Sequence, residues 1–337
     1  MKKIIVTGGA GYIGSHTVVE LFESGYEAII VDNFSNSEKS VLDGLREILG
    51  VKVKVYEGDC TDKDFMRDVF KIENPDGAIH FAAYKAVGES VAKPLKYYHN
   101  NIDSLIVLLE TMIKFGCGNL VFSSSCTVYG TPDKLPVTEK SPIKKAESPY
   151  GFTKQAAEQI IEDTVASESS LSAVALRYFN PIGAHPSSKI GELPIGTPSN
   201  LIPFVTQTAA GIRKELTVFG NDYNTPDGSN IRDYIHVVDL AKAHVKTLEY
   251  IQSQRQLFDT INVGTGKGNS VLEVLETFKK VTGQALRYRI GERRAGDVEQ
   301  IYAAVDKSKK VLGWEAELGL EDALRDAWKW QKTLKKQ

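Results

Sequence analysis

A serine, a tyrosine and a lysine are the residues of this chain best suited to moving a proton. Ser125 follows an apolar run that predicts a strand, and Tyr150 and Lys154 come just after Ser148-Pro149, a helix-start signal. Residues four apart lie on one face of a helix, so we expect the lysine ammonium to lower the pKa of the phenol. Such a phenol acts as general base and acid on a hydroxyl, to which Ser125 would also hydrogen-bond.

Position, rather than spacing, carries this assignment. The chain has 14 tyrosines and lysine is common in it, so one Tyr-x-x-x-Lys match is expected by chance, and Tyr150 supplies the one match. That match follows a strand-end serine and a capped helix start, where a catalytic pair would be placed. The alternative is a surface tyrosine with no role in chemistry.

Three glycines near the N-terminus indicate a second chemical site. Gly8, Gly11 and Gly14 follow the apolar run at residues 4–6 and precede a helical pattern. Glycines at this spacing let the backbone approach a pyrophosphate, and the helix start offers it N–H groups. Asp32 ends a second apolar run about twenty residues on, and a carboxylate there accepts hydrogen bonds from a ribose 2′-hydroxyl. The pattern favours NAD over NADP; a purely structural turn is the alternative.

The elements that must position these residues alternate between strand and helix in the first half. Residues 84–90 predict a turn that carries Lys85, a side chain able to reach phosphate or sugar. The alternation predicts an α/β fold with a Rossmann-type, doubly wound parallel sheet. We expect strands at residues 4–6, 28–31, 51–56, 77–83, 119–122 and 172–176, and helices at 38–49, 62–70, 94–115 and from 148 onward.

The second half is less regular. Residues 183–200 are rich in proline and glycine and predict a long functional loop, and residues 293–297 predict a basic turn. We expect a NAD-binding domain at residues 1–180, with chain returns near 231–265, and a smaller, mainly substrate-binding lobe at residues 181–337. Strands are expected at 217–219, 231–237 and 259–263, and helices at 201–211, 238–252 and 270–281, with two terminal helices after them.

The composition is that of an ordinary globular protein of 337 residues with a net charge of −2. The sequence has no basic block typical of nucleic-acid binding and no apolar run long enough to span a bilayer, so we expect neither partner. Its three cysteines lack CxxC spacing and its six histidines lack metal-ligand spacing, so no metal site is expected. A chain that opens on a strand and carries few cysteines is expected in the cytoplasm.

Longer runs point to a family. TGGAGYIG at residues 7–14, together with Ser125, Tyr150 and Lys154, resembles the extended short-chain dehydrogenase/reductase family. Four further runs resemble the branch of that family that epimerises carbon 4 of UDP-hexoses, and the similarity spans nearly the whole chain. These runs are KAVGES (85–90), RYFNPIGAHP (177–186), FGNDY (219–223) and RDYIHV (232–237).

The resemblance implies an NAD-dependent isomerase that interconverts UDP-galactose and UDP-glucose through a 4-keto intermediate. Tyr150 would take the proton of the sugar 4-hydroxyl while hydride passes to NAD, and Lys154 would also hold the nicotinamide ribose. The keto sugar would turn over while its nucleotide stays bound, and hydride and proton would return on the opposite face. The resemblance further implies a homodimer paired through the helices after Pro94 and Ser148.

The resemblance also implies which residues hold the two ligands. For NAD they are Gly8, Gly11, Tyr12, Ile13, Gly14, Asp32, Asn33, Phe34, Ser35, Asn36, Ser37, Asp59, Cys60, Phe81, Ala82, Ala83, Lys85, Asn100, Tyr150, Lys154 and Phe179. For the UDP-sugar they are Lys85, Ser125, Tyr150, Asn180, Asn200, Leu201, Thr217, Val218, Phe219, Arg232, Tyr234, Arg294, Asp297 and Ile301. The alternative for each is an ion pair or a core contact.

Ile301 is a departure from the family pattern. In many bacterial relatives the matching residue is a tyrosine that narrows the sugar end of the pocket, and smaller residues there accompany acceptance of N-acetylated sugars. We therefore expect UDP-N-acetylglucosamine and UDP-N-acetylgalactosamine as further substrates beside the main pair.

Other interpretations of the same residues remain open. A nucleotide-sugar 4,6-dehydratase would carry acidic residues just after the strand-end serine, whereas Ser125-Cys126-Thr127 has no carboxylate. A UDP-uronate epimerase would use the same machinery on another sugar, and a simple dehydrogenase would release NADH. A non-catalytic NAD sensor would not need Ser125, Tyr150 and Lys154 together.

Overall fold

The computed structural model describes residues 1–294 and 297–334. Ala295 and Gly296, which belong to the predicted basic turn, and residues 335–337 lie outside the described residues. The described residues contain no helix that is both long and apolar enough to cross a membrane.

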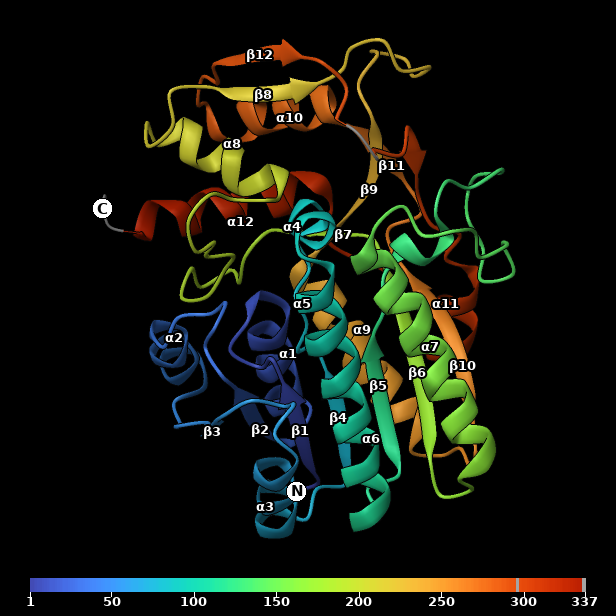
Figure 1. Cartoon of the computed structure of the whole chain (residues 1–337). Helices are drawn as coiled ribbons and strands as arrows, with labels where there is room; N and C mark the ends of the chain where they lie inside the picture. Colours follow the sequence, from blue (N-terminus) through green and yellow to red (C-terminus); the bar gives the residue numbers. More distant parts are fainter. Residues whose placement is uncertain (295–296, 335–337) are drawn as a thin grey trace.

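A seven-stranded parallel sheet forms the lower half of the molecule (Figure 1). The strand order is β10-β6-β5-β4-β1-β2-β3, and this confirms the predicted doubly wound α/β fold. Helices cover both faces of the central strands, which is why the sequence of those strands is continuously apolar. The strands are β1 Lys3–Thr7, β2 Glu27–Asp32, β3 Lys54–Glu57, β4 Gly77–His80, β5 Asn119–Ser123, β6 Ser172–Tyr178 and β10 Phe258–Val263.

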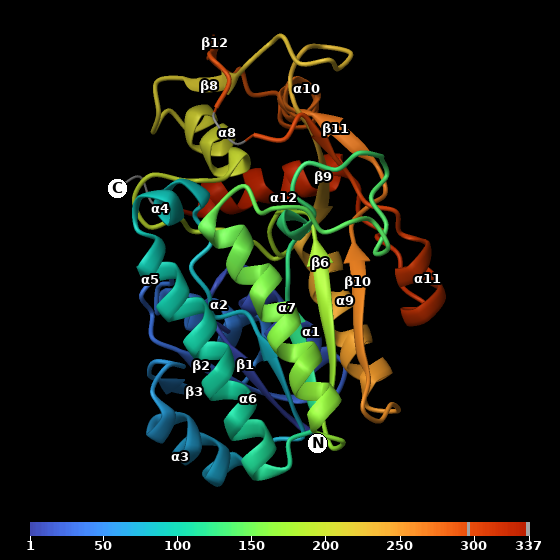
Figure 2. The same ribbon diagram turned by 45° about the vertical axis from the view of Figure 1, so that its right-hand side comes forward.

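Two apolar clusters hold the helices against the sheet. One cluster joins α1, α2 and α9 to one face, and the other joins α3, α6 and α7 to the opposite face. Figure 2 shows α6 and α7 side by side in front of the sheet. The helices are α1 Tyr12–Glu23, α2 Ser40–Leu49, α3 Lys63–Glu73, α6 Ser104–Phe115, α7 Pro149–Ser167 and α9 Val237–Ile251.

The order of the strands reverses between β1 and β4. The chain builds β2 and β3 on one side of β1, then crosses back to place β4 on the other side. In doubly wound sheets, ligands bind in the crevice at the carboxyl ends of the two strands that flank such a switch point. The glycine turn follows β1 and the small residues Ala82 and Ala83 follow β4, so both predicted motifs meet at this crevice.

A smaller lobe lies above the carboxyl ends of the sheet (Figure 1). Its apolar core is formed by side chains of α8, β8, β9, α10 and α12. β8 and β12 pair as a two-stranded sheet, and β7, β9, β11 and β13 form a second small sheet between the lobes. The elements are β7 Asn180–Ile182, α8 Leu201–Ala209, β8 Leu216–Phe219, β9 Ile231–His236, β11 Gly268–Ser270, α10 Val271–Thr282, β12 Tyr288–Gly291, β13 Gln300–Ile301, α11 Asp306–Leu312 and α12 Leu320–Thr333.

Several predicted elements differ in detail. The strand predicted at residues 51–56 begins at Lys54, and the predicted turn at 84–90 already contains the start of α4, Val87–Ala92. The helix predicted at 94–115 is α5, Pro94–Tyr98, followed by a π-helical turn, His99–Asp103, and then α6. The strands β7, β11, β12 and β13, each of two to four residues, were not expected.

Candidate active site

In the glycine turn after β1, backbone segments pass so close to one another that side chains would not fit. Gly8 has a φ of +68°, and a Cβ atom there would lie 2.8 Å from the backbone nitrogen of Ala82. A Cβ at Gly14 would collide with the carbonyl oxygen of Gly8, and one at Gly11 would lie 3.1 Å from the same oxygen. The three glycines therefore allow β1, the β4 exit and α1 to converge, which leaves the start of α1 facing the crevice.

Asp32 organises the neighbouring loop with its carboxylate. It accepts hydrogen bonds from the Ala10 backbone nitrogen at 3.0 Å, from the Phe34 backbone nitrogen at 2.9 Å and from Ser37 Oγ at 3.0 Å. Within the same loop, the Asn33 side chain accepts from the Ser35 backbone nitrogen at 3.0 Å. The Asp32 carboxylate thus ties the glycine turn to residues 33–37, the segment predicted to bind the adenosine half of NAD.

Asp59 connects this loop to the end of β3. Its carboxylate accepts from Asn33 Nδ2 at 2.9 Å and from the backbone nitrogen and hydroxyl of Thr61 at 2.9 and 2.7 Å. These hydrogen bonds lower the pKa of Asp59 against the opposing effect of burial. The neighbouring Cys60 is buried, and its side chain packs in the apolar cluster on one face of the sheet.

A carboxylate that the sequence did not single out joins the two lobes. Glu192 Oε1 accepts a hydrogen bond from Asn200 Nδ2 at 2.5 Å and lies 3.5 Å from the ammonium of Lys85. Tyr12, from the glycine turn, donates from its hydroxyl to the Gly183 carbonyl at 2.7 Å. Glu192 therefore links Lys85, which was predicted to bind both ligands, to Asn200, which was predicted to bind the UDP-sugar.

Tyr150 and Lys154 lie on the buried face of α7, beside the end of β5. Ser148 caps this helix by accepting from the Gly151 backbone nitrogen at 3.1 Å, and Pro149 occupies the first turn. Tyr150 is 9% exposed and Lys154 4%. Lys154 Nζ donates to the Ser123 carbonyl at 2.5 Å and lies 4.8 Å from the centre of the Phe122 ring.

Ser125 follows β5 and begins a short 3₁₀ helix, Cys126–Tyr129. Its hydroxyl accepts from the Thr127 backbone nitrogen at 3.2 Å. The nearby Ser125 hydroxyl acts to lower the pKa of the Tyr150 phenol. The structure therefore brings Ser125, Tyr150 and Lys154 together, as their positions in the sequence suggested.

The electrostatics of the pair differ from the sequence-based prediction. Burial raises the pKa of Tyr150 above its ordinary value, and the neighbouring Tyr178 raises it further. Burial also lowers the pKa of Lys154 to about 7, while Glu158 acts to raise it. The expectation that the pKa of Tyr150 lies below its ordinary value is therefore wrong for the protein's own groups, because burial dominates.

Asn100 lies in the π-helical turn and donates from its side chain to Asn101 Oδ1 at 3.0 Å. Asn101, which the sequence did not single out, is 5% exposed. Its Nδ2 donates to the Tyr84 carbonyl at 3.0 Å and to Thr153 Oγ1 at 3.2 Å. Asn101 thus ties the exit of β4 to α7, and the NAD contact of Asn100 stays a prediction.

The upper lobe gathers the predicted uridine diphosphate residues at one edge. Arg294 Nη2 donates to Asp297 Oδ1 at 2.7 Å, and Arg232 Nη2 lies 3.9 Å from the same oxygen. The Arg294 guanidinium is 5.6 Å from the centre of the Phe219 ring, which is 42% exposed. An exposed aromatic ring beside two arginines suits a base and its phosphates.

Other predicted substrate residues lie around this edge with different exposure. Asn180 begins β7 and pairs in register with Tyr234 of β9, and Leu201 begins α8 directly after Asn200. Thr217 and Val218 belong to β8, but the Val218 side chain is 1% exposed and packs in the lobe's core. At Val218 only the backbone is therefore placed to meet a ligand.

Ile301 and Phe179 lie in one buried cluster with the turn that follows Ser125. Ile301 is 5% exposed, pairs in register with Arg232, and packs in a cluster that includes Cys126, Tyr129 and Phe179. Ile301 therefore pairs with the predicted phosphate-binding arginine and packs in one cluster with Cys126, the residue after the predicted catalytic serine. The role of Ile301 in limiting the size of a bound sugar stays a prediction.

Comparisons with known proteins match this arrangement along most of the chain. Residues 4–264 match the NAD dependent epimerase/dehydratase family. The chain is 51% identical over 330 residues to the UDP-glucose 4-epimerase of Bacillus subtilis, with 98% of this chain and 97% of the relative covered.

Two solved structures are similar over nearly their whole length. One is the UDP-glucose 4-epimerase from Bifidobacterium longum in complex with NAD+ and UDP, with a TM-score of 0.95, 48% identity and 98% of each chain covered. The other is the enzyme from Stenotrophomonas maltophila with bound NAD and formylated UDP-arabinopyranose, with a TM-score of 0.96, 45% identity, and 99% of this chain and 98% of that chain covered.

Proposed function

The chain belongs to the NAD dependent epimerase/dehydratase family, and from this membership we propose the reaction and the residues that perform it. The protein is an NAD-dependent isomerase that inverts carbon 4 of UDP-hexoses and interconverts UDP-glucose and UDP-galactose. The observation that carries the residue assignment is the meeting of Ser125, Tyr150 and Lys154 at the crevice beside the glycine turn.

The residues of the crevice fit NAD. Side chains at Gly8 and Gly14 would fill the turn, so the backbone alone borders the place where a pyrophosphate approaches the start of α1. Asp32 stands at the carboxyl end of β2, where a carboxylate accepts from ribose hydroxyls. When bound, NAD supplies the hydride acceptor and donor for carbon 4, so that the sugar passes through a 4-keto form.

Tyr150 acts as the general base and then as the general acid. Its phenolic oxygen takes the proton of the 4-hydroxyl and later returns it, and Ser125 hydrogen-bonds the same hydroxyl. Burial raises the pKa of the Tyr150 phenol. Lys154 supplies a positive charge one helical turn away, which favours the phenolate. With NAD bound, the Tyr150 phenolate would be stabilised further by the positive charge of the oxidised nicotinamide.

The upper lobe holds the nucleotide while the hexose turns. Arg232 and Arg294 neutralise the pyrophosphate, and Phe219 lies against the uracil ring. Asn180 and Asn200 donate hydrogen bonds to the UDP portion of the substrate. Because the sugar itself is held less tightly than its nucleotide, either face of the 4-keto sugar can meet the same hydride donor.

The product formed without added NAD tests the reaction. Purified protein is incubated separately with UDP-galactose and with UDP-N-acetylgalactosamine, and the products are separated by chromatography. The expected result is UDP-glucose in the first reaction and, because Ile301 is smaller than tyrosine, UDP-N-acetylglucosamine in the second. A dehydrated keto sugar would indicate a 4,6-dehydratase, and unchanged substrate would contradict catalysis. In a parallel reaction with added NAD, a steady rise in NADH absorbance would indicate a simple dehydrogenase.

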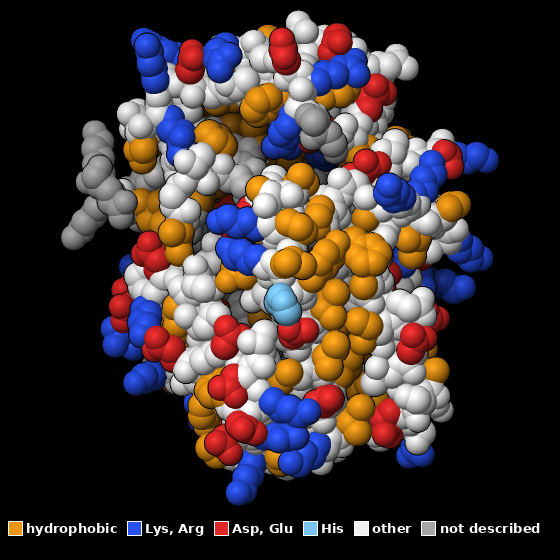
Figure 3. Space-filling model, viewed as in Figure 1, with side chains coloured by type: hydrophobic (Ala, Val, Ile, Leu, Met, Phe, Trp, Pro, Cys, Tyr) orange, Lys and Arg blue, Asp and Glu red, His pale blue; other side chains and the backbone are white. Residues whose placement is uncertain are grey.

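The outer faces of α4 to α7 suit a second copy of this chain. Apolar side chains gather over these helices (Figure 3). They include Val87, Val91, Leu95, Ile106, Ile113 and Phe152, each between 38% and 69% exposed. Apolar faces on two neighbouring helices can pair with their own copies across a two-fold axis, so we propose a homodimer.

Light scattering coupled to size-exclusion chromatography tests the dimer. Leu95→Glu is expected to shift the molecular mass from that of a dimer toward that of a monomer, because it places a charge in the proposed interface. Ile72→Glu is the matched control, since Ile72 is 64% exposed on α3 and lies outside these helices. A monomeric wild-type protein would contradict the proposal.

We also propose a cytoplasmic location. Cys60, Cys117 and Cys126 are free and buried, which suits a reducing compartment. Fractionation of the source cells, with detection of the native protein, tests the location; recovery from a secreted or membrane fraction would contradict it.

A further inference from the structure

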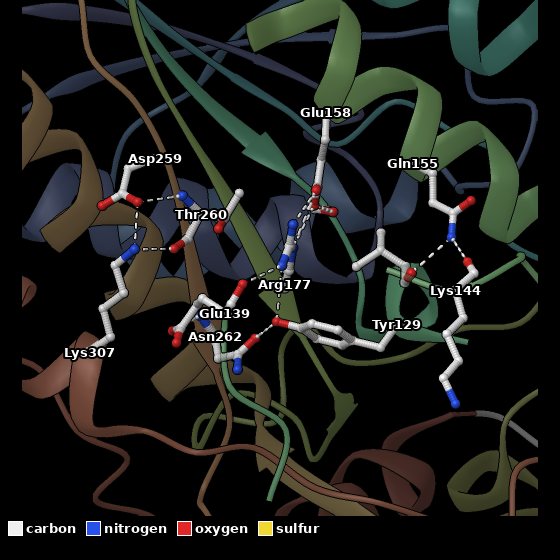
Figure 4. A network of polar contacts seen from close by, with 12 residues as sticks. Tyr129, Glu139, Lys144, Gln155, Glu158, Arg177, Asp259, Thr260, Asn262 and Lys307 are labelled. Carbon is white, nitrogen blue, oxygen red and sulfur yellow. Dashed lines mark hydrogen bonds and ion pairs between the residues drawn. The ribbon is translucent and has the colours of Figure 1, made fainter. Parts of the chain in front are cut away.

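A buried ion pair lies directly behind the site, and the mechanism above does not use it. Arg177 Nη2 donates to Glu158 Oε2 at 2.6 Å, and Arg177 Nε donates to Glu158 Oε1 at 3.0 Å. Glu158 is 5% exposed and Arg177 4%. Figure 4 shows the two side chains pointing toward each other from α7 and β6. A buried pair of this kind is weak evidence for stability alone, because removing both charges from water is costly.

The two side chains of the pair form hydrogen bonds to both ends of the segment that carries Ser125. On one side, Ser124 Oγ donates to Glu158 Oε1 at 2.5 Å. On the other, Arg177 Nη1 donates to the Tyr129 hydroxyl at 3.2 Å, and this hydroxyl donates to Asn262 Oδ1 at 2.6 Å. Ser125 lies between these two anchors, so the position of its hydroxyl depends on both of them.

Glu158 also lies one helical turn beyond Lys154 on the same buried face of α7. The other titratable groups around this turn are Tyr150, His80 of β4, Tyr178 of β6 and Cys126. Burial lowers the pKa of His80 to about 3 and raises the pKa of the two phenols and the thiol, so all four are neutral at pH 7. Glu158 is the group whose charge favours the ammonium form of Lys154.

We infer that Glu158 is a positioning residue for the catalytic group. Through Ser124 it fixes the turn that carries Ser125, and through its negative charge it holds Lys154 as an ammonium. This inference rests on the proposed function of Ser125, Tyr150 and Lys154, and it extends that function to a residue that touches neither ligand.

Glu158→Gln tests the inference because it keeps the size of the side chain and removes its charge. We expect kcat for UDP-galactose to fall at least about tenfold, with KM changed less than about twofold. The alkaline limb of the kcat profile should move about one unit toward lower pH, because Lys154 then loses its proton more easily. Glu162→Gln is the matched control, since Glu162 is exposed one turn further along α7 and should change neither quantity.

Two further variants separate the two roles of Glu158. Ser124→Ala removes the hydrogen bond and keeps the charge, so kcat should fall while the alkaline limb stays in place. Glu158→Gln alone leaves the buried Arg177 guanidinium without its carboxylate partner and can prevent folding. Combining it with Arg177→Gln removes that unpaired charge, so the double variant tests the effect of the Glu158 charge even if the single variant does not fold. If that double variant is folded and has the wild-type kcat and alkaline limb, the inference is wrong.

A measurement without turnover provides an independent check. Because burial lowers the pKa of Lys154, the contribution of Lys154 to stability against urea should rise with pH above about 7. In Glu158→Gln the rise in stability should begin at a lower pH than in Glu162→Gln. An identical pH dependence of stability in the two variants would contradict the inference. Wild-type protein without epimerase activity would instead contradict the proposed function.

Discussion

The lower sheet and the upper lobe hold their functional side chains in different ways. In the sheet half, Tyr150 and Lys154 are at most 9% exposed, and buried hydrogen bonds fix the elements that carry them. In the upper lobe, the Arg294 side chain is 58% exposed and the Phe219 ring 42%. Proton and hydride transfer require fixed groups away from water, whereas a nucleotide must enter and leave, so the two regions differ in burial for a functional reason.

The largest expected effect comes from the buried half. Tyr150→Phe removes the one oxygen assigned to proton transfer and should lower kcat about 10³-fold with little change in UDP affinity. Timed assays of UDP-galactose conversion and calorimetric titration with UDP measure the two quantities. Tyr288→Phe is the control, because Tyr288 is 43% exposed on β12 and should keep full activity. Unchanged turnover of Tyr150→Phe would favour the non-catalytic NAD sensor.

The two arginines of the upper lobe should differ in strength. The Arg232 side chain is 16% exposed, so Arg232→Ala should weaken UDP binding about 10- to 100-fold. Arg294 is mostly exposed and solvent screens its charge, so Arg294→Ala should weaken binding only about threefold. Calorimetric titration with UDP measures both, and equal losses would contradict the difference in burial.

Acid should destabilise the sheet half through its buried histidines. Burial lowers the pKa of His16 and His80 to about 3 and of His244 to about 4. The unfolded chain binds protons near the ordinary pKa of 6.5, so the stability present above that pH is lost as the pH falls toward 4. Each histidine should contribute about 2 kcal/mol to the loss between about pH 7 and pH 5.

Urea unfolding at pH 7 and pH 5 measures this loss. His244→Leu should reduce the pH dependence by one histidine's share, because it removes a buried titrating group. His99→Asn is the control, since the His99 side chain is 80% exposed and should leave the pH dependence unchanged. Equal pH dependence in wild type and His244→Leu would show that burial of this histidine does not matter for acid stability.

A change in selectivity, rather than in overall activity, is expected where the two regions meet. Ile301→Tyr should reduce activity on UDP-N-acetylgalactosamine about tenfold relative to UDP-galactose, because a larger side chain narrows the sugar end of the pocket. The ratio of kcat/KM for the two substrates measures this selectivity. Equal loss of both activities would refute the assignment of Ile301.

Local patterns in the sequence were enough for the sheet half. The strand at residues 4–6, the glycines and the Ser148-Pro149 helix start are short-range signals, and the structure has β1, the glycine turn and α7 at those places. The short strands of the upper lobe lack such a signal, because pairing partners distant in sequence define them. Glu158 could have been inferred from the sequence, since it continues the four-residue spacing of Tyr150 and Lys154. Glu192 could not, because it lies in a loop without a periodic pattern.

The sequence by itself determined the parallel sheet, the turn for a dinucleotide and the pair of residues on one helix face, because each depends on neighbours a few positions away. Only the tertiary structure decided that Glu192 meets Lys85 and Asn200, that Glu158 meets Ser124 and Arg177, and that the pKa of Tyr150 rises rather than falls. Those outcomes depend on which distant segments exclude water from a group, and this is a property of the packed chain as a whole.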